Sequence, residues 1–187
     1  MKGETKMAED ELGLISLYWG DGKGKTTAAL GLALRALGHG FRVHLIQFFK
    51  GGSKSGFQEY GELSALRRFE RFSYEQFGVS DWIIGRPTPE QKEVGQRALV
   101  ASREAISSAE YDLVILDEIL YAVSFGVLSV EDILRLLEEK APKTEVVLTG
   151  SHKRLPELEA VADLVTEVKK IKHPYDRGIG ARKGIEY

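Results

Sequence analysis

Short apolar runs alternate along the chain with longer segments that have helical periodicity. Runs of strand length, which we predict to be strands, occupy residues 12–19, 41–49, 69–77, 111–117, 145–149 and 164–171. Segments rich in helix-forming residues, which we predict to be helices, occupy residues 26–37, 59–68, 88–108, 129–140 and 156–162. The clearest strands are apolar throughout instead of alternating, which is typical of parallel strands that are covered on both faces. The pattern therefore predicts an α/β fold, with a parallel sheet flanked by helices.

Two helix starts are marked by their residues. Thr88, Pro89 and Gln91 form a capping box with proline at the first helical position, which predicts where the helix over 88–108 begins. Ser129 is the expected N-cap of the helix over 129–140. We see no internal repeat or linker, so the 187 residues are predicted to form a single nucleotide-binding domain over residues 1–187, with residues 1–11 as a flexible tail.

Composition and charge exclude several classes of function. Lys plus Arg number 26 and Asp plus Glu number 28, which gives a formal net charge of −2 and no general attraction to nucleic acid or to anionic membrane. The chain has no cysteine, so it has no thiolate metal site and no cysteine nucleophile. The polar N-terminus lacks a secretory signal, and no apolar run reaches the length that spans a bilayer. We therefore expect a cytoplasmic protein without a nucleic-acid or membrane partner.

A glycine-rich loop follows the first predicted strand and precedes the first predicted helix. Its residues are Gly20, Asp21, Gly22, Lys23, Gly24, Lys25, Thr26 and Thr27. The second half matches the phosphate loop, whose backbone N–H groups surround phosphates, but the first half is one residue short, since Trp19 stands where the first glycine is usual. Lys25 would bring a positive charge to the phosphates, and Thr26 would place its hydroxyl on a magnesium ion. We predict a P-loop NTPase (RecA-like) fold in which all the residues of this loop bind a nucleoside triphosphate.

Two acidic residues, Asp117 and Glu118, stand at the end of the apolar strand predicted over 111–117. In phosphate-loop proteins an aspartate at this place holds magnesium, directly or through water, so Asp117 is the second candidate metal ligand. Ligands of open α/β sheets bind beyond the C-terminal ends of the strands, where both acids should lie. Glu118 has three open roles: it could orient an attacking water, order the loop or bind substrate. The alternative is a strand that ends in solvent with two acids.

Three segments together resemble the corrinoid adenosyltransferases of the CobA/BtuR type. They are the short phosphate loop within residues 20–40 together with residues 47–51, the stretch YDLVILDEI at 111–119, and the C-terminal part, VVLTG followed by residues 162–187. The missing loop residue and the lysine between the last loop glycines are the most specific signs. The resemblance covers residues 13–187 and is weakest between residues 53 and 88.

The resemblance implies transfer of the 5′-deoxyadenosyl group of ATP to Co(I) of a corrinoid, with release of triphosphate. The cobalt is then the nucleophile, so the chain needs only to position ATP, stabilise the leaving triphosphate and shape the corrinoid site. It implies ATP as cosubstrate, Mg²⁺ or Mn²⁺, a corrinoid substrate, a homodimer and an electron-donor reductase as partner. We expect Lys25 and Glu118 to be catalytic. Phe77 and Trp82 are the candidates for displacing the lower axial ligand of the corrinoid, with core packing as the alternative.

One stretch departs from the family. The usual Thr-Gly-Arg reads Thr149-Gly150-Ser151 here, and Arg154, three residues on, is the candidate replacement for the missing arginine. Two other functions remain open from the residues alone. Glu118 after Asp117 also suits a RecA-like ATPase or a nucleoside kinase. The Arg/Lys-rich C-terminal part also suits a module that binds nucleotide or corrinoid without catalysis.

Overall fold

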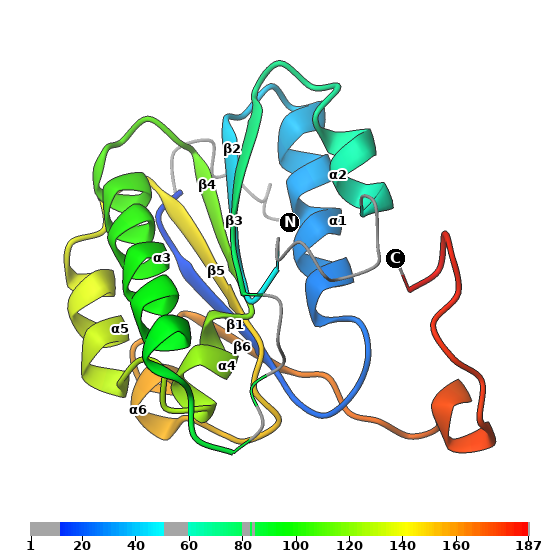
Figure 1. The fold of residues 1–187 in the computed structure, drawn as a ribbon. Helices are drawn as coiled ribbons and strands as arrows, with labels where there is room; N and C mark the ends of the chain where they lie inside the picture. The colour runs from blue at the N-terminus through cyan, green and yellow to red at the C-terminus, as the bar shows by residue number, and fades with distance from the viewer. Residues whose placement is uncertain (1–11, 51–59, 80–82, 84, 187) are drawn as a thin grey trace, which may run out of the picture.

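A computed structural model describes residues 12–50, 60–79, 83 and 85–186 of the chain (Figure 1). Residues 1–11, for which the sequence predicts a flexible tail, and Trp82, a candidate corrinoid contact, lie outside the described residues. No helix in the described ranges combines the length and the apolar character needed to cross a membrane.

The centre of the molecule is one sheet of six parallel strands, in the order β3-β2-β4-β5-β1-β6. The strands are β1 Ile15–Trp19, β2 Val43–Phe48, β3 Phe72–Phe77, β4 Leu113–Asp117, β5 Glu145–Thr149 and β6 Leu164–Glu167. Each lies within a run predicted as a strand, and the predicted parallel sheet flanked by helices is confirmed. β6 stops at Glu167, four residues before the predicted end, and the chain then passes behind the phosphate loop.

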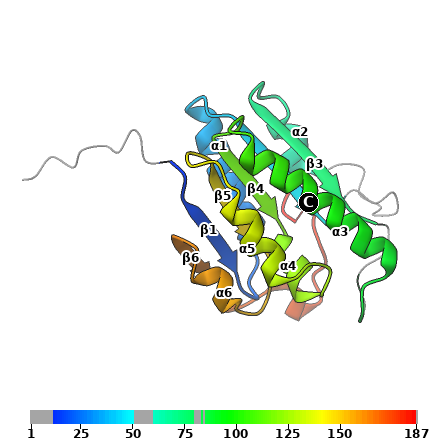
Figure 2. The same ribbon diagram turned by 90° about the vertical axis from the view of Figure 1, so that its left-hand side faces the viewer.

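Helices cover both faces of this sheet. They are α1 Lys25–Gly38, α2 Gly61–Leu66, α3 Pro89–Ser107, α4 Ile119–Ser124, α5 Val130–Glu138 and α6 Pro156–Glu159, and a 3₁₀ helix, η1 Pro174–Arg177, follows β6. Figures 1 and 2 show α1 and α2 on one face and α3, α4, α5 and α6 on the other. The two-layer covering explains why β4 is apolar from Leu113 to Leu116: Ile115 packs toward α1, while Val114 and Leu116 pack toward α3 and α5.

The two marked helix starts are capped as predicted. The Thr88 hydroxyl accepts a hydrogen bond from Gln91 N (3.2 Å), and the Gln91 side chain accepts one from Thr88 N (2.9 Å). Ser129 and Asp132 form the same reciprocal pair at the start of α5. Each pair satisfies two of the N–H groups that a helix leaves unbonded at its start.

Helix α4 was not predicted. Glu118 adopts a left-handed conformation (φ 66°), and α4 begins at the next residue. This sharp turn folds the chain back under the sheet edge, so that the segment after β4 returns to the site. Because all strands are parallel, β1, β4 and β5 end at the same edge, and this brings the phosphate loop, Asp117 and Thr149 together.

Candidate nucleotide-binding site

The first half of the glycine-rich loop is fixed against the segment that follows β6. Gly20 N donates to Ser151 O (2.9 Å), and Gly22 N donates to Val168 O (2.7 Å). Gly20 has φ 120°, and a Cβ atom there would lie 2.3 Å from Val168 O, so only glycine fits this position. The N–H groups of Gly20 and Gly22 are therefore engaged within the protein and do not face a phosphate.

The second half of the loop leads into the first turn of α1 with its backbone donors available. The first helical hydrogen bond runs from Ala28 N to Gly24 O (2.8 Å). The N–H groups of Lys25, Thr26 and Thr27 come before it and therefore have no acceptor within the helix. Such N–H groups at a helix start, together with the positive end of the helix dipole, form an anion-binding site. The second half of the loop therefore has the donors that an anion requires, and the first half does not.

Lys25 lies folded over this loop. Its Nζ atom donates to Gly20 O (2.6 Å) and Gly22 O (2.9 Å) and lies 6.0 Å from the centre of the Tyr121 ring. Burial lowers the pKa of Lys25, and nearby carboxylates, Glu118 foremost, partly offset this effect. The ammonium group is held by neutral carbonyl oxygens, which phosphate oxygens can replace with a stronger, charge-assisted contact.

Asp117 is the centre of a buried hydrogen-bond network. Its Oδ1 accepts from the hydroxyls of Thr26 (2.8 Å) and Thr149 (2.7 Å). Its Oδ2 accepts from Gln47 Nε2 (3.0 Å) and Lys50 Nζ (3.3 Å). The network joins three strands and a helix, since these residues lie at or just after the ends of β2, β4 and β5 or in the first turn of α1.

The residues present fit a magnesium ion in one particular way. The Asp117 carboxylate has two donors on each oxygen, which fills its acceptor sites, so a metal held by Asp117 through water fits better than direct ligation. The Thr26 hydroxyl would be the direct protein ligand in this arrangement. Within the described ranges, no three His, Asp or Glu residues group into a metal cluster.

Glu118 and Lys50 face each other beside Asp117. The Glu118 Oε1 and Lys50 Nζ atoms are 3.8 Å apart, and Glu118 N donates to the Thr149 hydroxyl (2.9 Å). Burial raises the pKa of Glu118 to about 7, with Asp117 adding to the shift and Lys50 opposing it. Burial lowers the pKa of Lys50, but the attraction of Asp117 and Glu118 outweighs it and the pKa is raised, so Lys50 is a permanent cation in the pocket.

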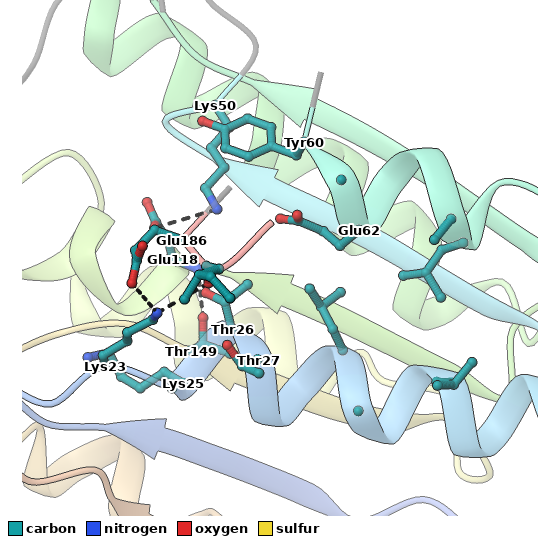
Figure 3. Close-up of a pocket in the computed structure, with 18 of the residues that line it drawn as sticks. Lys23, Lys25, Thr26, Thr27, Lys50, Tyr60, Glu62, Glu118, Thr149 and Glu186 are labelled. Carbon is teal, nitrogen blue, oxygen red and sulfur yellow. Dashed lines mark hydrogen bonds and ion pairs between the residues drawn. The ribbon is translucent and has the colours of Figure 1, made fainter. Parts of the chain in front are cut away.

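These groups line one pocket of about 870 Å³, a size that suits a nucleotide. Figure 3 shows Lys25, Thr26 and Thr27 at its floor, with Lys50 and Glu118 above them. Its wall also contains parts of α1 and α2, Tyr121 on α4, and a C-terminal stretch, Gly184 to Glu186.

The structure brings most of the predicted site residues together. Gly22 to Thr27 and Glu118 line the pocket, and Asp117 lies directly behind Thr26. Asp21 points away from it and accepts a hydrogen bond from Lys170 N (2.9 Å). Phe77 is half-buried at the end of β3, where it packs against the core, and among the described residues it is not part of the pocket wall.

Several residues in or behind the pocket were given no role from the sequence. Lys50, Tyr121, Thr149 and the C-terminal stretch line the pocket, and Gln47 lies behind it on Asp117. Gln47 carried a signal, because it is a polar residue near the end of a largely apolar strand. Lys50 follows the same strand end. Neither signal shows that β2 lies next to β4, which is what places both side chains on Asp117.

Arg154 does not stand in for the family's arginine in this structure. Its guanidinium donates through Nε and Nη2 to Glu159 on α6, its side chain is 66% exposed, and it is not among the described residues of the pocket wall. Ser151, at the family's arginine position, is buried with φ 55° and accepts a hydrogen bond from Lys153 N (3.0 Å). The positive charge in the pocket comes from lysines instead.

Comparison with known proteins identifies relatives over nearly the whole chain. The family model described as ATP:corrinoid adenosyltransferase BtuR/CobO/CobP matches residues 11–187. The corrinoid adenosyltransferase of Escherichia coli K12 is 34% identical over 96% of this chain and 88% of its own length. That of Pseudomonas aeruginosa is 33% identical over 96% and 86%, and corrinoid adenosyltransferase CobA of Salmonella typhimurium is 32% identical over 96% and 88%.

Proposed function

We propose that this chain, which belongs to the ATP:corrinoid adenosyltransferase family, holds the triphosphate of ATP as a leaving group between Lys25, Lys50 and the first turn of α1. The chain is a corrinoid adenosyltransferase that uses ATP and a corrinoid. Family membership decides against the ATPase, the nucleoside kinase and the non-catalytic module as its main function. The proposal concerns which residues do the work.

The observation that carries the proposal is the distribution of charge in the pocket. Lys23, Lys25 and Lys50 line it together with the N–H groups at the start of α1. In the reaction, the electron pair of Co(I) forms a bond to C5′ of ATP, the C5′–oxygen bond breaks, and its electron pair leaves on triphosphate. Negative charge therefore develops on the leaving oxygen, and preorganised cations and N–H donors lower the energy of that transition state.

Magnesium fits the same scheme. We propose that the Thr26 hydroxyl holds it directly and Asp117 through water, since both Asp117 oxygens already have two protein donors. The ion would neutralise part of the triphosphate charge when bound. Thr149 and Gln47 hold the Asp117 carboxylate in place for this purpose.

Glu118 takes a positioning role in our proposal. The reaction transfers no proton to or from the reacting carbon, so it needs no general base. Glu118 instead lies 3.8 Å from Lys50 and contributes the charge that holds Lys50 over the pocket. It also lines the pocket itself, so it limits how far the phosphates extend toward β4.

The corrinoid contacts, the homodimer, the electron-donor reductase and the cytoplasmic location are further proposals from the resemblance. For the corrinoid, we propose a site at the C-terminal edge of the sheet, beyond β2 and β3. Phe77 pairs with Phe48 at that edge, two residues before Lys50. A corrinoid bound there would lie next to the ATP pocket, as attack on C5′ requires.

The test is an anaerobic assay with ATP, magnesium and chemically reduced cobalamin. We expect the absorbance of the cobalt–carbon bond to rise in step with triphosphate, one for one. The control omits cobalamin and should give neither triphosphate nor ADP. Release of ADP and orthophosphate without cobalamin, with no adenosylated product, would contradict the proposal.

A further inference from the structure

The C-terminal segment forms one wall of the nucleotide pocket. After β6 and η1 the chain turns back toward α1 and α2 (Figure 1), and Gly184, Ile185 and Glu186 line the pocket together with Glu118 and Thr149. This wall is more than 160 residues from the phosphate loop in sequence, as the Lys23–Glu186 contact shows. A bound nucleotide would therefore touch both ends of the chain's described part.

One loop lysine fastens this wall. Lys23 Nζ donates to Glu186 Oε1 (2.8 Å) and to Ile185 O (3.2 Å), as Figure 3 shows for the carboxylate. Arg182 holds the same carboxylate through its backbone N (2.7 Å), its Nε (3.2 Å) and its Nη2 (3.1 Å). These donors, Arg182 first and Lys23 next, lower the pKa of Glu186 to about 2, so the carboxylate stays ionised at neutral pH.

We propose that the turn Arg182–Glu186 is a latch on the ATP pocket and that Glu186 is its positioning residue. Glu186 holds Lys23 at the pocket rim and, through Lys23, keeps Gly184 and Ile185 against the bound nucleotide. The latch slows the departure of ATP before the corrinoid reacts. This inference rests on the proposal that the second half of the loop holds the triphosphate.

The contacts favour a latch over the alternative in which Glu186 competes with phosphate for Lys23. A lysine ammonium has three N–H donors, and Lys23 uses two of them on the turn, so one remains for a phosphate oxygen. The carboxylate of Glu186 lies between two cations, Lys23 and Arg182, and the cluster is positive as a whole. A triphosphate can therefore approach without net repulsion.

The expected change in ATP dissociation follows from how far the side chains of the ion pair are exposed to solvent. The Lys23 and Glu186 side chains are 40% and 20% exposed, and partly exposed ion pairs shift equilibria by about two- to fivefold. We expect Glu186→Gln, which keeps the side-chain shape, to speed ATP dissociation by roughly that factor. The KM for ATP should rise by more than kcat falls, because a latch acts on binding before it acts on chemistry.

The experiment is a chase of bound radiolabelled ATP with excess unlabelled ATP, on the full chain with magnesium. Glu186→Gln is compared with Glu159→Gln, which removes a carboxylate from the Arg154 ion pair outside the pocket and should leave the dissociation rate unchanged. The same comparison in a Lys23→Gln background should abolish the effect of Glu186→Gln, because the latch acts through Lys23.

Two results would overturn the latch: a dissociation rate for Glu186→Gln equal to or slower than wild type, or an undiminished effect in the Lys23→Gln background. Failure of the underlying proposal looks different. If the loop does not hold the triphosphate, Lys25→Ala will bind ATP as tightly as wild type, whatever Glu186→Gln does.

Discussion

In our proposal, transition-state stabilisation depends most on Lys25. In the structure its ammonium contacts the loop carbonyls of Gly20 and Gly22 and the Tyr121 ring, which are neutral groups that phosphate oxygens can replace. We expect Lys25→Ala to lower kcat/KM for adenosyl transfer by about 100-fold or more, the usual cost of removing one such stabilising group. Steady-state rates with reduced cobalamin measure this.

Lys25→Arg is the matched variant for that prediction. This variant keeps the positive charge but replaces the compact ammonium group with a larger planar one. It should therefore be faster than Lys25→Ala but slower than wild type. If Lys25→Ala keeps a kcat/KM within about threefold of wild type, the charge at this position is not what stabilises the leaving group.

Thr149 connects the two acids of the site. Its hydroxyl donates to Asp117 Oδ1 (2.7 Å) and accepts from Glu118 N (2.9 Å), and the residue is fully buried. Thr149→Val keeps the shape but leaves the Glu118 N–H without a partner, so it should lower the free energy of unfolding by about 1–3 kcal/mol. Urea denaturation measures the change.

Thr149→Ser, which retains the hydroxyl, is the control and should lose much less stability. Equal losses for valine and serine would mean that the methyl packing, and not the hydrogen bonds, determines the effect. The Thr149→Val enzyme should also show a weaker dependence on magnesium, because Asp117 loses one of the donors that fix it.

At the scale of single residues, the sequence predicted what lies within a continuous motif. The loop residues Gly22 to Thr27, and Asp117 and Glu118, came from local patterns and all lie at the pocket. Lys50 and Glu186 could not be assigned, because their roles arise from contacts between segments far apart in sequence. No local spacing contains that information.

At the scale of elements, the glycine-rich loop and the segment after β6 pack closely against each other. A Cβ atom at Gly20 would lie 2.3 Å from Val168 O, and φ there is 120°. Gly20→Ala should therefore lower the free energy of unfolding by about 1–3 kcal/mol, from backbone strain together with the clash. Thermal or urea unfolding measures it.

Gly31 on α1 gives the opposite expectation and serves as the comparison. A Cβ atom there meets nothing within 4 Å, so Gly31→Ala should stabilise the protein by about 0.5–1 kcal/mol through helix propensity. If Gly20→Ala proves neutral, the loop and the segment at Val168 do not pack as closely in solution as described.

Periodicity predicted elements well where a single pattern extends over many residues. Helix α3 was predicted over its full length, since the capping box at Thr88 fixes its start. Helix α4 was missed, because it has six residues and begins after the left-handed turn at Glu118, which no periodicity signals. Strand β6 was predicted too long, because pairing with β1 ends at Glu167 although the sequence beyond it still fits an edge strand.

At the scale of the molecule, the sheet order is what assembles the site. β5 lies between β1 and β4, so Thr149 reaches Asp117 from one side while Gln47 and Lys50 reach it from β2 on the other. The sequence predicted a parallel sheet but not this order, because the residues of an apolar strand do not indicate which strands lie beside it. The resemblance to a family supplied the function that strand order alone could not.

ATP should stabilise the whole molecule, because its pocket joins α1, α2, the end of β5 and the C-terminal turn. A ligand at 100 times its Kd adds about 2.7 kcal/mol to the free energy of unfolding, which for a chain of this size raises Tm by roughly 5–10 °C. Thermal unfolding with ATP and magnesium measures the shift.

Two controls test where the stabilisation comes from. With a chelator in place of magnesium the shift in Tm should shrink, since Thr26 and Asp117 then act without the ion. In Lys25→Ala the shift should also shrink at the same ATP concentration. A full shift in Lys25→Ala would place the stabilising contacts elsewhere in the pocket and away from the phosphate loop.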